Sequence, residues 1–166
     1  TSSPNGDVAS IGGNPNNLYI GYGPQSTTLT AQSASNLSYS WSPAAGLSCT
    51  NCASPVFTPL AEGYYTFTVN ATDSKGCTSQ NTITICVMDI RASSGSSGNG
   101  NGHQNGTGNG NSGKVYVCHL PPGNPANEQT ICISVNAVPA HVPLHGGDHL
   151  GRCDQVCGSS SKSLED

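Results

Sequence analysis

The sequence predicts an all-β protein, an antiparallel Ig-like β-sandwich followed by a small disulfide-rich β/loop domain. Three observations lead to this prediction. In the first half of the chain, short β-prone runs alternate with turn residues roughly every 8–12 residues. A Gly/Asn/Ser-rich stretch then interrupts this pattern. Beyond that stretch, cysteine and histidine crowd into a short C-terminal segment.

The first 91 residues contain the segments that we expect to pair as strands. Residues 1–16 are rich in Gly, Asn, Pro and Ser, and their short apolar patch is expected to be a lead-in or a first edge strand. Further strands are expected at residues 18–20, 26–32, 37–42, 55–59, 65–71 and 83–87. Turns rich in Gly, Pro and Asp divide them, at 43–46, 62–63 and 73–76.

The clearest strand pattern surrounds the only tryptophan. Leu37, Tyr39 and Trp41 alternate with serines, which gives one apolar face and one polar face with a period of two residues. A strand of this kind is half-buried, with its apolar face against the core. We therefore expect Trp41 to fill the space between the two sheets of the sandwich.

Residues 92–113 mark the domain boundary. They consist mainly of Gly, Asn and Ser and have no apolar residue beyond Ala92, so they cannot offset the conformational entropy lost on folding. We therefore expect residues 1–91 to form the β-sandwich, 92–113 a flexible linker, 114–158 a small Cys/His-rich domain and 159–166 a disordered tail.

The small domain is expected to contain two strands and one helical turn. Residues 114–118 and 129–135 are β-prone, and residues 135–141 favour a helical turn capped by Asn136. Pro143 and the pair Gly146-Gly147 keep this turn short. A unit of about 45 residues buries little apolar area, so it is expected to need disulfides or a metal ion for stability.

Three histidines and one aspartate form the candidate metal site: His119, His141, His145 and Asp148. Zinc accepts imidazole nitrogens and a carboxylate in a tetrahedral shell, and copper, the second expectation, also accepts them. The alternative is that these histidines hydrogen-bond to loop carbonyl groups, which a loop-rich domain must satisfy. His149 is the weakest candidate of the cluster.

Two weaker sets of candidates lie outside this cluster. Calcium is considered at strand ends, although no EF-hand spacing is present, and the aspartates concerned are Asp7, Asp73 and Asp89. An exposed aromatic strip that stacks on sugar rings is considered as an alternative to simple strand packing, and its members are Tyr19, Tyr22, Tyr64 and Tyr65.

The eight cysteines are expected to form disulfides in an oxidising compartment. The expected pairs are Cys49–Cys52, Cys77–Cys86, Cys118–Cys153 and Cys132–Cys157. A rival interpretation makes Cys118 and Cys153 thiolate ligands of zinc. If all eight cysteines pair, the intact mass lacks eight protons relative to the reduced chain.

Two parts of the chain resemble modules of bacterial surface proteins. Residues about 15–90, with W-S-P at 41–43 and T-D-S-K-G-C at 72–77, resemble the PKD-like modules of gliding-motility-type adhesins. Nearly all of 114–153 resembles a small module with a C-H-x-P-P-G-N opening and an H-G-D-x-L-G-x-C ending. The resemblance implies an Ig-like sandwich that acts as a spacer, adhesion unit or carbohydrate-contacting unit. It also implies the signature positions Cys118, His119, His141, His145, Asp148 and Cys153.

Composition limits the functions that the chain can have. Charged residues are only 8% and the formal net charge is −4, so a nucleic-acid partner, which requires a basic surface, is not expected. No apolar run has the length of a membrane span. No nucleophile elbow, H-E-x-x-H motif or telling acidic pair indicates an enzyme.

We therefore expect a non-catalytic, secreted or cell-surface bacterial protein with a structural and adhesive role, such as an adhesin or a component of a surface fibre. Its partners would be other copies or modules of surface proteins, or glycan surfaces. Edge strands that pair between subunits would allow a filament to form. The alternative is a carbohydrate-binding accessory module of a secreted hydrolase.

Overall fold

The computed structural model describes residues 17–31, 36–92, 113–124, 126–142, 147–155 and 157. This part of the chain is mostly β-structure, which confirms the predicted fold class. Its elements are β1 (Asn17–Ile20), β2 (Thr27–Thr28), β3 (Ser38–Ser42), β4 (Val56–Phe57), β5 (Gly63–Thr72), β6 (Thr78–Asp89), β7 (Lys114–His119), β8 (Gln129–Ser134), the 3₁₀ turn η1 (Val135–Ala137), α2 (Val138–His141) and β9 (His149–Leu150). Within these ranges no helix combines the length and the hydropathy that crossing a bilayer requires.

The N-terminal sandwich consists of a four-stranded sheet and a two-stranded sheet. The larger sheet has the order β1-β6-β5-β3, in which β1 runs parallel to β6 and the other neighbours are antiparallel. The smaller sheet pairs β2 with β4. Both sheets contribute to one buried core, whose members are Leu18, Leu29, Trp41, Phe57, Phe67, Ile85 and Val87. These apolar side chains explain why the two sheets pack face to face.

Trp41 lies in this core, as its alternation with serines predicts. It is 5% exposed, and its indole Nε1 donates a hydrogen bond of 2.9 Å to the carbonyl oxygen of Cys52. Phe57 from β4 meets Phe67 from β5 with ring centroids 4.8 Å apart. Aromatic contacts between the two sheets therefore fill the centre of the sandwich.

The long β5–β6 hairpin differs most from the expected strands. The sequence pattern predicts strands at 65–71 and 83–87, but the two strands extend to ten and twelve residues. Gly63, expected in a turn, is the first residue of β5. The turn at the far end forms where expected, because the Oδ1 atom of Asp73 accepts hydrogen bonds from the backbone N–H groups of Lys75 and Cys77. By contrast, the described part of the expected strand at 26–32 is reduced to the two residues of β2, and Gln32 lies outside the described residues.

The C-terminal unit is a three-stranded antiparallel sheet with the order β8-β7-β9, accompanied by η1 and α2. The helical turn is present, but its predicted cap is wrong. The side chain of Ser134, rather than Asn136, is the cap, and it accepts a hydrogen bond of 3.3 Å from the N–H of Asn136. Strand β9 was not expected, because two residues are too few to show a periodic pattern.

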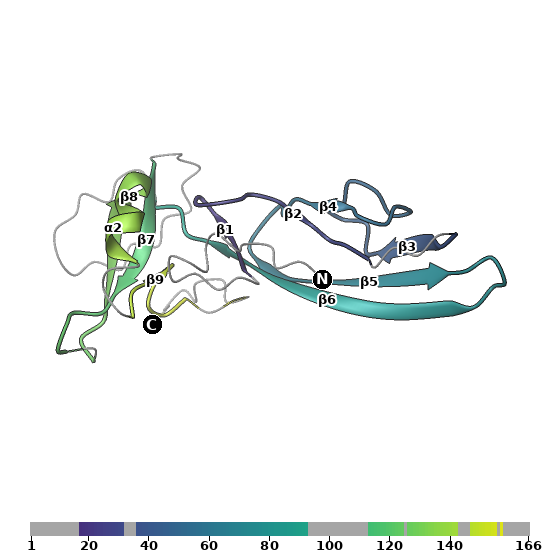
Figure 1. Cartoon of the computed structure of the whole chain (residues 1–166). Coiled ribbons are helices and arrows are strands. Elements are labelled where there is room, and N and C mark those ends of the chain that lie inside the picture. Colours follow the sequence, from purple (N-terminus) through teal and green to yellow (C-terminus); the bar gives the residue numbers. More distant parts are fainter. Residues whose placement is uncertain are drawn as a thin grey trace, which may run out of the picture.

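The end of β6 joins the sandwich to the C-terminal unit. Ile85 and Val87 point into the sandwich core, whereas Cys86 and Met88 lie on the opposite face of the strand. That opposite face packs against the C-terminal unit in a second core, whose buried members are Tyr19, Cys86, Met88, Ile90, Val115, Val117, Val138, Val142 and Leu150. Strand β6 therefore contributes to both cores, and β1 does the same through Leu18 and Tyr19. Figure 1 shows the C-terminal unit at the opposite end of the molecule from the β5–β6 turn.

Backbone pairing continues across the junction. The N–H of Tyr116 donates to the carbonyl oxygen of Ile90 (2.8 Å), and the N–H of Ala92 donates to that of Lys114 (3.0 Å). Residues on the two sides of the Gly/Asn/Ser-rich stretch are thus direct neighbours. Gly151 packs closely at this junction, because an added Cβ would lie 2.9 Å from Oε1 of Gln155 and 3.3 Å from Cε of Met88. Its φ of +97° also favours glycine.

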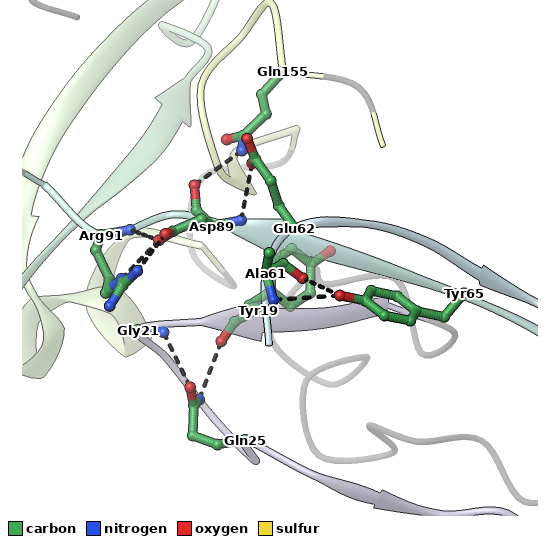
Figure 2. Close-up of polar contacts among 9 residues, drawn as sticks. All are labelled: Tyr19, Gly21, Gln25, Ala61, Glu62, Tyr65, Asp89, Arg91 and Gln155. Atoms are coloured by element: carbon green, nitrogen blue, oxygen red, sulfur yellow. Dashed lines mark hydrogen bonds and ion pairs between the residues drawn. The ribbon is translucent and has the colours of Figure 1, made fainter. Parts of the chain in front are cut away.

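Asp89 is the polar centre of the junction (Figure 2). Its carboxylate accepts a 2.9 Å hydrogen bond from Nε of Arg91, and its backbone carbonyl accepts one of 3.0 Å from the side-chain amide of Gln155. The backbone N–H of Asp89 donates to the carboxylate of Glu62 at 3.4 Å. The last residues of β6 are therefore held by groups from both parts of the chain.

Candidate metal centre

The register of two short strands brings His119 and Asp148 together. Strand β7 pairs with β9 so that Val117 lies opposite Leu150 and Cys118 opposite His149. The next step of this antiparallel register places His119, the last residue of β7, opposite Asp148, which directly precedes β9. The side chains of His119 and Asp148 are therefore in direct contact, although the two residues are 29 positions apart in the sequence.

Both oxygens of the Asp148 carboxylate have partners. The Oδ2 atom lies 2.9 Å from Nδ1 of His119, and Oδ1 accepts a 2.8 Å hydrogen bond from the backbone N–H of Leu120. The side chain of Asp148 is fully buried, whereas that of His119 is 24% exposed. A buried carboxylate without such partners would cost several kcal/mol, so these contacts compensate its desolvation.

His141, the last residue of α2, completes a group of three. Its ring stands perpendicular to that of His119, with the two ring centroids 6.3 Å apart, and its Nδ1 atom is buried. One ligand atom from each of His119, His141 and Asp148 lies within 4.8 Å of the others. We call these three residues the His–Asp triad. A strand end, a helix end and a strand start therefore converge on one point.

The other two histidines of the predicted cluster, His145 and His149, are not part of the triad that the structure describes. His145 lies outside the described residues. His149 is adjacent to Asp148 on the chain, so its side chain points to the other face of the strand, and its Nδ1 lies 3.3 Å from the carbonyl oxygen of Leu150. The N–H of Leu120 could not be predicted as part of the site, since a backbone donor leaves no signature in a pattern of side chains.

A second group of residues with metal-ligand side chains contains two cysteines that form a disulfide with each other. Cys118, Glu128 and Cys153 lie near one another, but Cys118 and Cys153 are bonded to each other. The rival interpretation of these two cysteines as thiolate ligands of zinc is therefore wrong for this structure. The bond instead fixes β7 to the segment after β9, immediately beside His119.

Two of the four expected disulfides are present and two are wrong. Cys49 pairs with Cys52, and Cys118 pairs with Cys153, as expected. The expected Cys77–Cys86 and Cys132–Cys157 pairs are replaced by Cys86–Cys157. Cys77 and Cys132 are free thiols.

Strand geometry explains the first of these errors. Cys77 directly precedes β6 and Cys86 lies near its far end, so about nine strand residues hold their Cα atoms roughly 30 Å apart. A disulfide requires Cα atoms within about 7 Å. Cys132 has a different constraint, because it lies on β8 opposite Tyr116, whereas Cys157 packs against the second core beside Cys86. Sequence proximity was therefore a poor guide to pairing.

The structure also gives the surroundings of the tyrosine strip and of two calcium candidates. Only Tyr64 of the expected strip is largely exposed, at 65%; Tyr19 is buried, Tyr22 packs against the second core, and Tyr65 packs against the sandwich core. Of the calcium candidates, Asp73 closes the hairpin turn and Asp89 pairs with Arg91. Asp7 lies outside the described residues.

Comparison with known proteins identifies the first half of the chain. Residues 17–87 match the family model described as K319L-like, PKD domain. Comparison with curated proteins gives no match. Among solved structures, the solution structure of the PKD domain from KIAA 1837 protein is 26% identical, covers 52% of this chain and 85% of its own, and superposes with a TM-score of 0.37. Residues 17–87 of this chain therefore form a PKD-like domain.

Proposed function

We propose that the chain is a structural and adhesive module of a secreted or cell-surface bacterial protein, an adhesin or a component of a surface fibre. The observation that carries the proposal is the junction between the PKD-like domain and the C-terminal unit. The Cys86–Cys157 disulfide and the second core connect the two units covalently and through apolar contact. Such a connection suits a rigid spacer, and PKD domains are commonly structural or adhesive modules.

The disulfides support the proposed secreted or cell-surface location. Three bonds link six of the eight cysteines, and disulfides persist mainly in oxidising, extracellular compartments. The role that we propose is not catalytic. Its partners are other copies or modules of surface proteins, reached through strand edges of the sheets.

Binding of the non-reduced chain to whole bacterial cells tests this role, together with sedimentation velocity over a wide range of concentrations. We expect cell binding, concentration-dependent association or both. A chain that stays monomeric and does not bind cells would contradict the proposal. Reduction and alkylation of the chain provides the control, because opening Cys86–Cys157 should weaken any binding that depends on the joined units.

A carbohydrate-binding accessory role is the second candidate, and Tyr64 is the observation that favours it. Tyr64 is 65% exposed and lies on the same face of β5 as Thr66 and Thr68. An exposed aromatic ring beside uncharged hydroxyl groups suits stacking on a sugar. Glycan-array binding that is lost in Tyr64→Ala and kept in Tyr64→Phe would favour this candidate. Cell binding that is unchanged in Tyr64→Ala would favour the structural role.

A further inference from the structure

We propose that the His–Asp triad binds one divalent metal ion of the zinc class. This inference goes beyond the structural and adhesive role and does not depend on it. Its basis is the convergence of His119, His141 and Asp148, whose ligand atoms lie within 4.8 Å of one another. These three residues come from different elements of the C-terminal unit, so their meeting is a property of the fold and not of local sequence.

The spacing of the ligand atoms fits a tetrahedral ion after a small adjustment, in which His119 and Asp148 move slightly apart and His141 moves closer. Bonds of about 2.0–2.2 Å place the ligand atoms of a tetrahedral zinc roughly 3.3–3.5 Å apart. The Nδ1 atom of His119 and the Oδ2 atom of Asp148 are already 2.9 Å apart. An ion could thus take the place of the hydrogen between these two atoms if their separation increased by a few tenths of an ångström, with His141 approaching from the third side.

The chemistry of the ligands selects the class of ion. Two imidazoles and one carboxylate suit zinc, copper or nickel, whereas calcium and magnesium prefer shells made of oxygen atoms. Three protein ligands leave one tetrahedral position for water or for a group from a binding partner. The buried carboxylate of Asp148 also favours a cation, because a positive charge beside it offsets its desolvation.

Metal binding would cross-link the C-terminal unit where it is small and poor in apolar core. The ion would connect the end of β7, the end of α2 and the start of β9, next to the Cys118–Cys153 disulfide. Units of this size commonly depend on such cross-links. We therefore expect binding of the ion to stabilise the fold of the C-terminal unit.

Calorimetric titration of the metal-free, non-reduced chain with zinc chloride at pH 7.5 tests the proposal, together with thermal unfolding of the zinc-loaded chain. We expect one zinc ion per chain and a melting temperature that rises by roughly 5–10 °C when free zinc is about 100 times its Kd. His141→Ala and Asp148→Asn should each weaken zinc binding at least about tenfold. The matched control is His149→Ala, which removes a neighbouring histidine outside the triad and should leave the affinity unchanged.

X-ray absorption of the zinc-loaded wild-type chain keeps the test decisive if a variant does not fold. The proposal requires a shell of nitrogen and oxygen atoms with histidine scattering. Sulfur in the shell would assign the ion to cysteines such as Cys77 or Cys132 and would overturn the proposal. Absence of stoichiometric binding, equal binding in His141→Ala, or loss of binding in His149→Ala would overturn it as well.

Discussion

The carboxylate of Asp148 lies where the ends of β7 and α2 meet the start of β9. One of its oxygens accepts the N–H of Leu120 and the other contacts His119. Part of this arrangement could be predicted from the sequence, since the spacing of histidines and aspartate indicated a cluster. The contact between His119 and Asp148 could not, because it depends on the register of a two-residue strand.

Removal of this carboxylate should destabilise the chain even without metal. In chelator-treated protein, we expect Asp148→Ala to lower the free energy of unfolding by about 2–4 kcal/mol, because the partly buried N–H of Leu120 and the His119 ring lose their acceptor. Asp148→Asn keeps an acceptor oxygen and should cost less. Urea unfolding measures both. Asp154→Ala changes an exposed aspartate of the same unit and should stay within about 0.5 kcal/mol of wild type.

The two free thiols differ in their surroundings. Cys77 is exposed, whereas partial burial raises the pKa of Cys132, against a smaller lowering of that pKa by the charge of Lys114. A raised pKa leaves less thiolate at a given pH, and the thiolate is the form that reacts with alkylating reagents.

Alkylation of the unreduced chain should therefore proceed in two steps. At pH 8 we expect iodoacetamide to label Cys77 first and Cys132 more slowly, and the rate at Cys132 should increase as the pH rises further. The intact mass before labelling should lack six protons, one pair for each of the three disulfides. Peptide mapping identifies the labelled residues, and a loss of eight protons would show that Cys77 and Cys132 are bonded.

At the scale of the element, β6 has two different halves. Its first half is exposed on the outer face, whereas Ile85, Cys86, Val87 and Met88 are all buried. The alternation of Ile83, Ile85 and Val87 correctly predicted the inward face. The uninterrupted run I-C-V-M was the signal that the outer face is also covered, because strands buried on both faces lose the polar alternation. What covers that face could not be predicted from β6 alone.

Lysine substitutions on the outer face of β6 should affect stability differently in these two halves. We expect Met88→Lys to lower the free energy of unfolding by about 3 kcal/mol, because a charge would enter the second core. Thr82→Lys lies on the same face in the exposed half and should change stability by less than about 0.5 kcal/mol. Urea unfolding of both variants measures the difference, and equal effects would show that the C-terminal unit does not cover Met88.

At the scale of the whole molecule, the sequence suggested two modules held apart by a linker. The structure places the residues that flank this stretch in direct contact, since Ala92 donates a hydrogen bond to Lys114. Composition can indicate that a segment lacks a core of its own, but it carries no information on whether the ends of that segment meet. The Cys86–Cys157 bond could not be predicted from the sequence either, because it joins residues 71 positions apart.

Loss of this long-range bond should cost more than loss of a short one. Chain entropy gives about 4 kcal/mol for the loop closed by Cys86–Cys157 and about 2 kcal/mol for the loop closed by Cys49–Cys52. We therefore expect the double variant Cys86→Ser/Cys157→Ser to unfold at lower urea concentration than Cys49→Ser/Cys52→Ser. The reverse order would mean that the two units are not stabilised by being joined.

Differential scanning calorimetry of the full, non-reduced chain tests most directly whether the PKD-like domain and the C-terminal unit form one body. The two strands that contribute to both cores, the second core itself and the disulfide predict a single transition, with a calorimetric enthalpy equal to the van't Hoff enthalpy. Two resolved transitions, or a calorimetric enthalpy well above the van't Hoff value, would show two units that unfold independently and would contradict a single folded body.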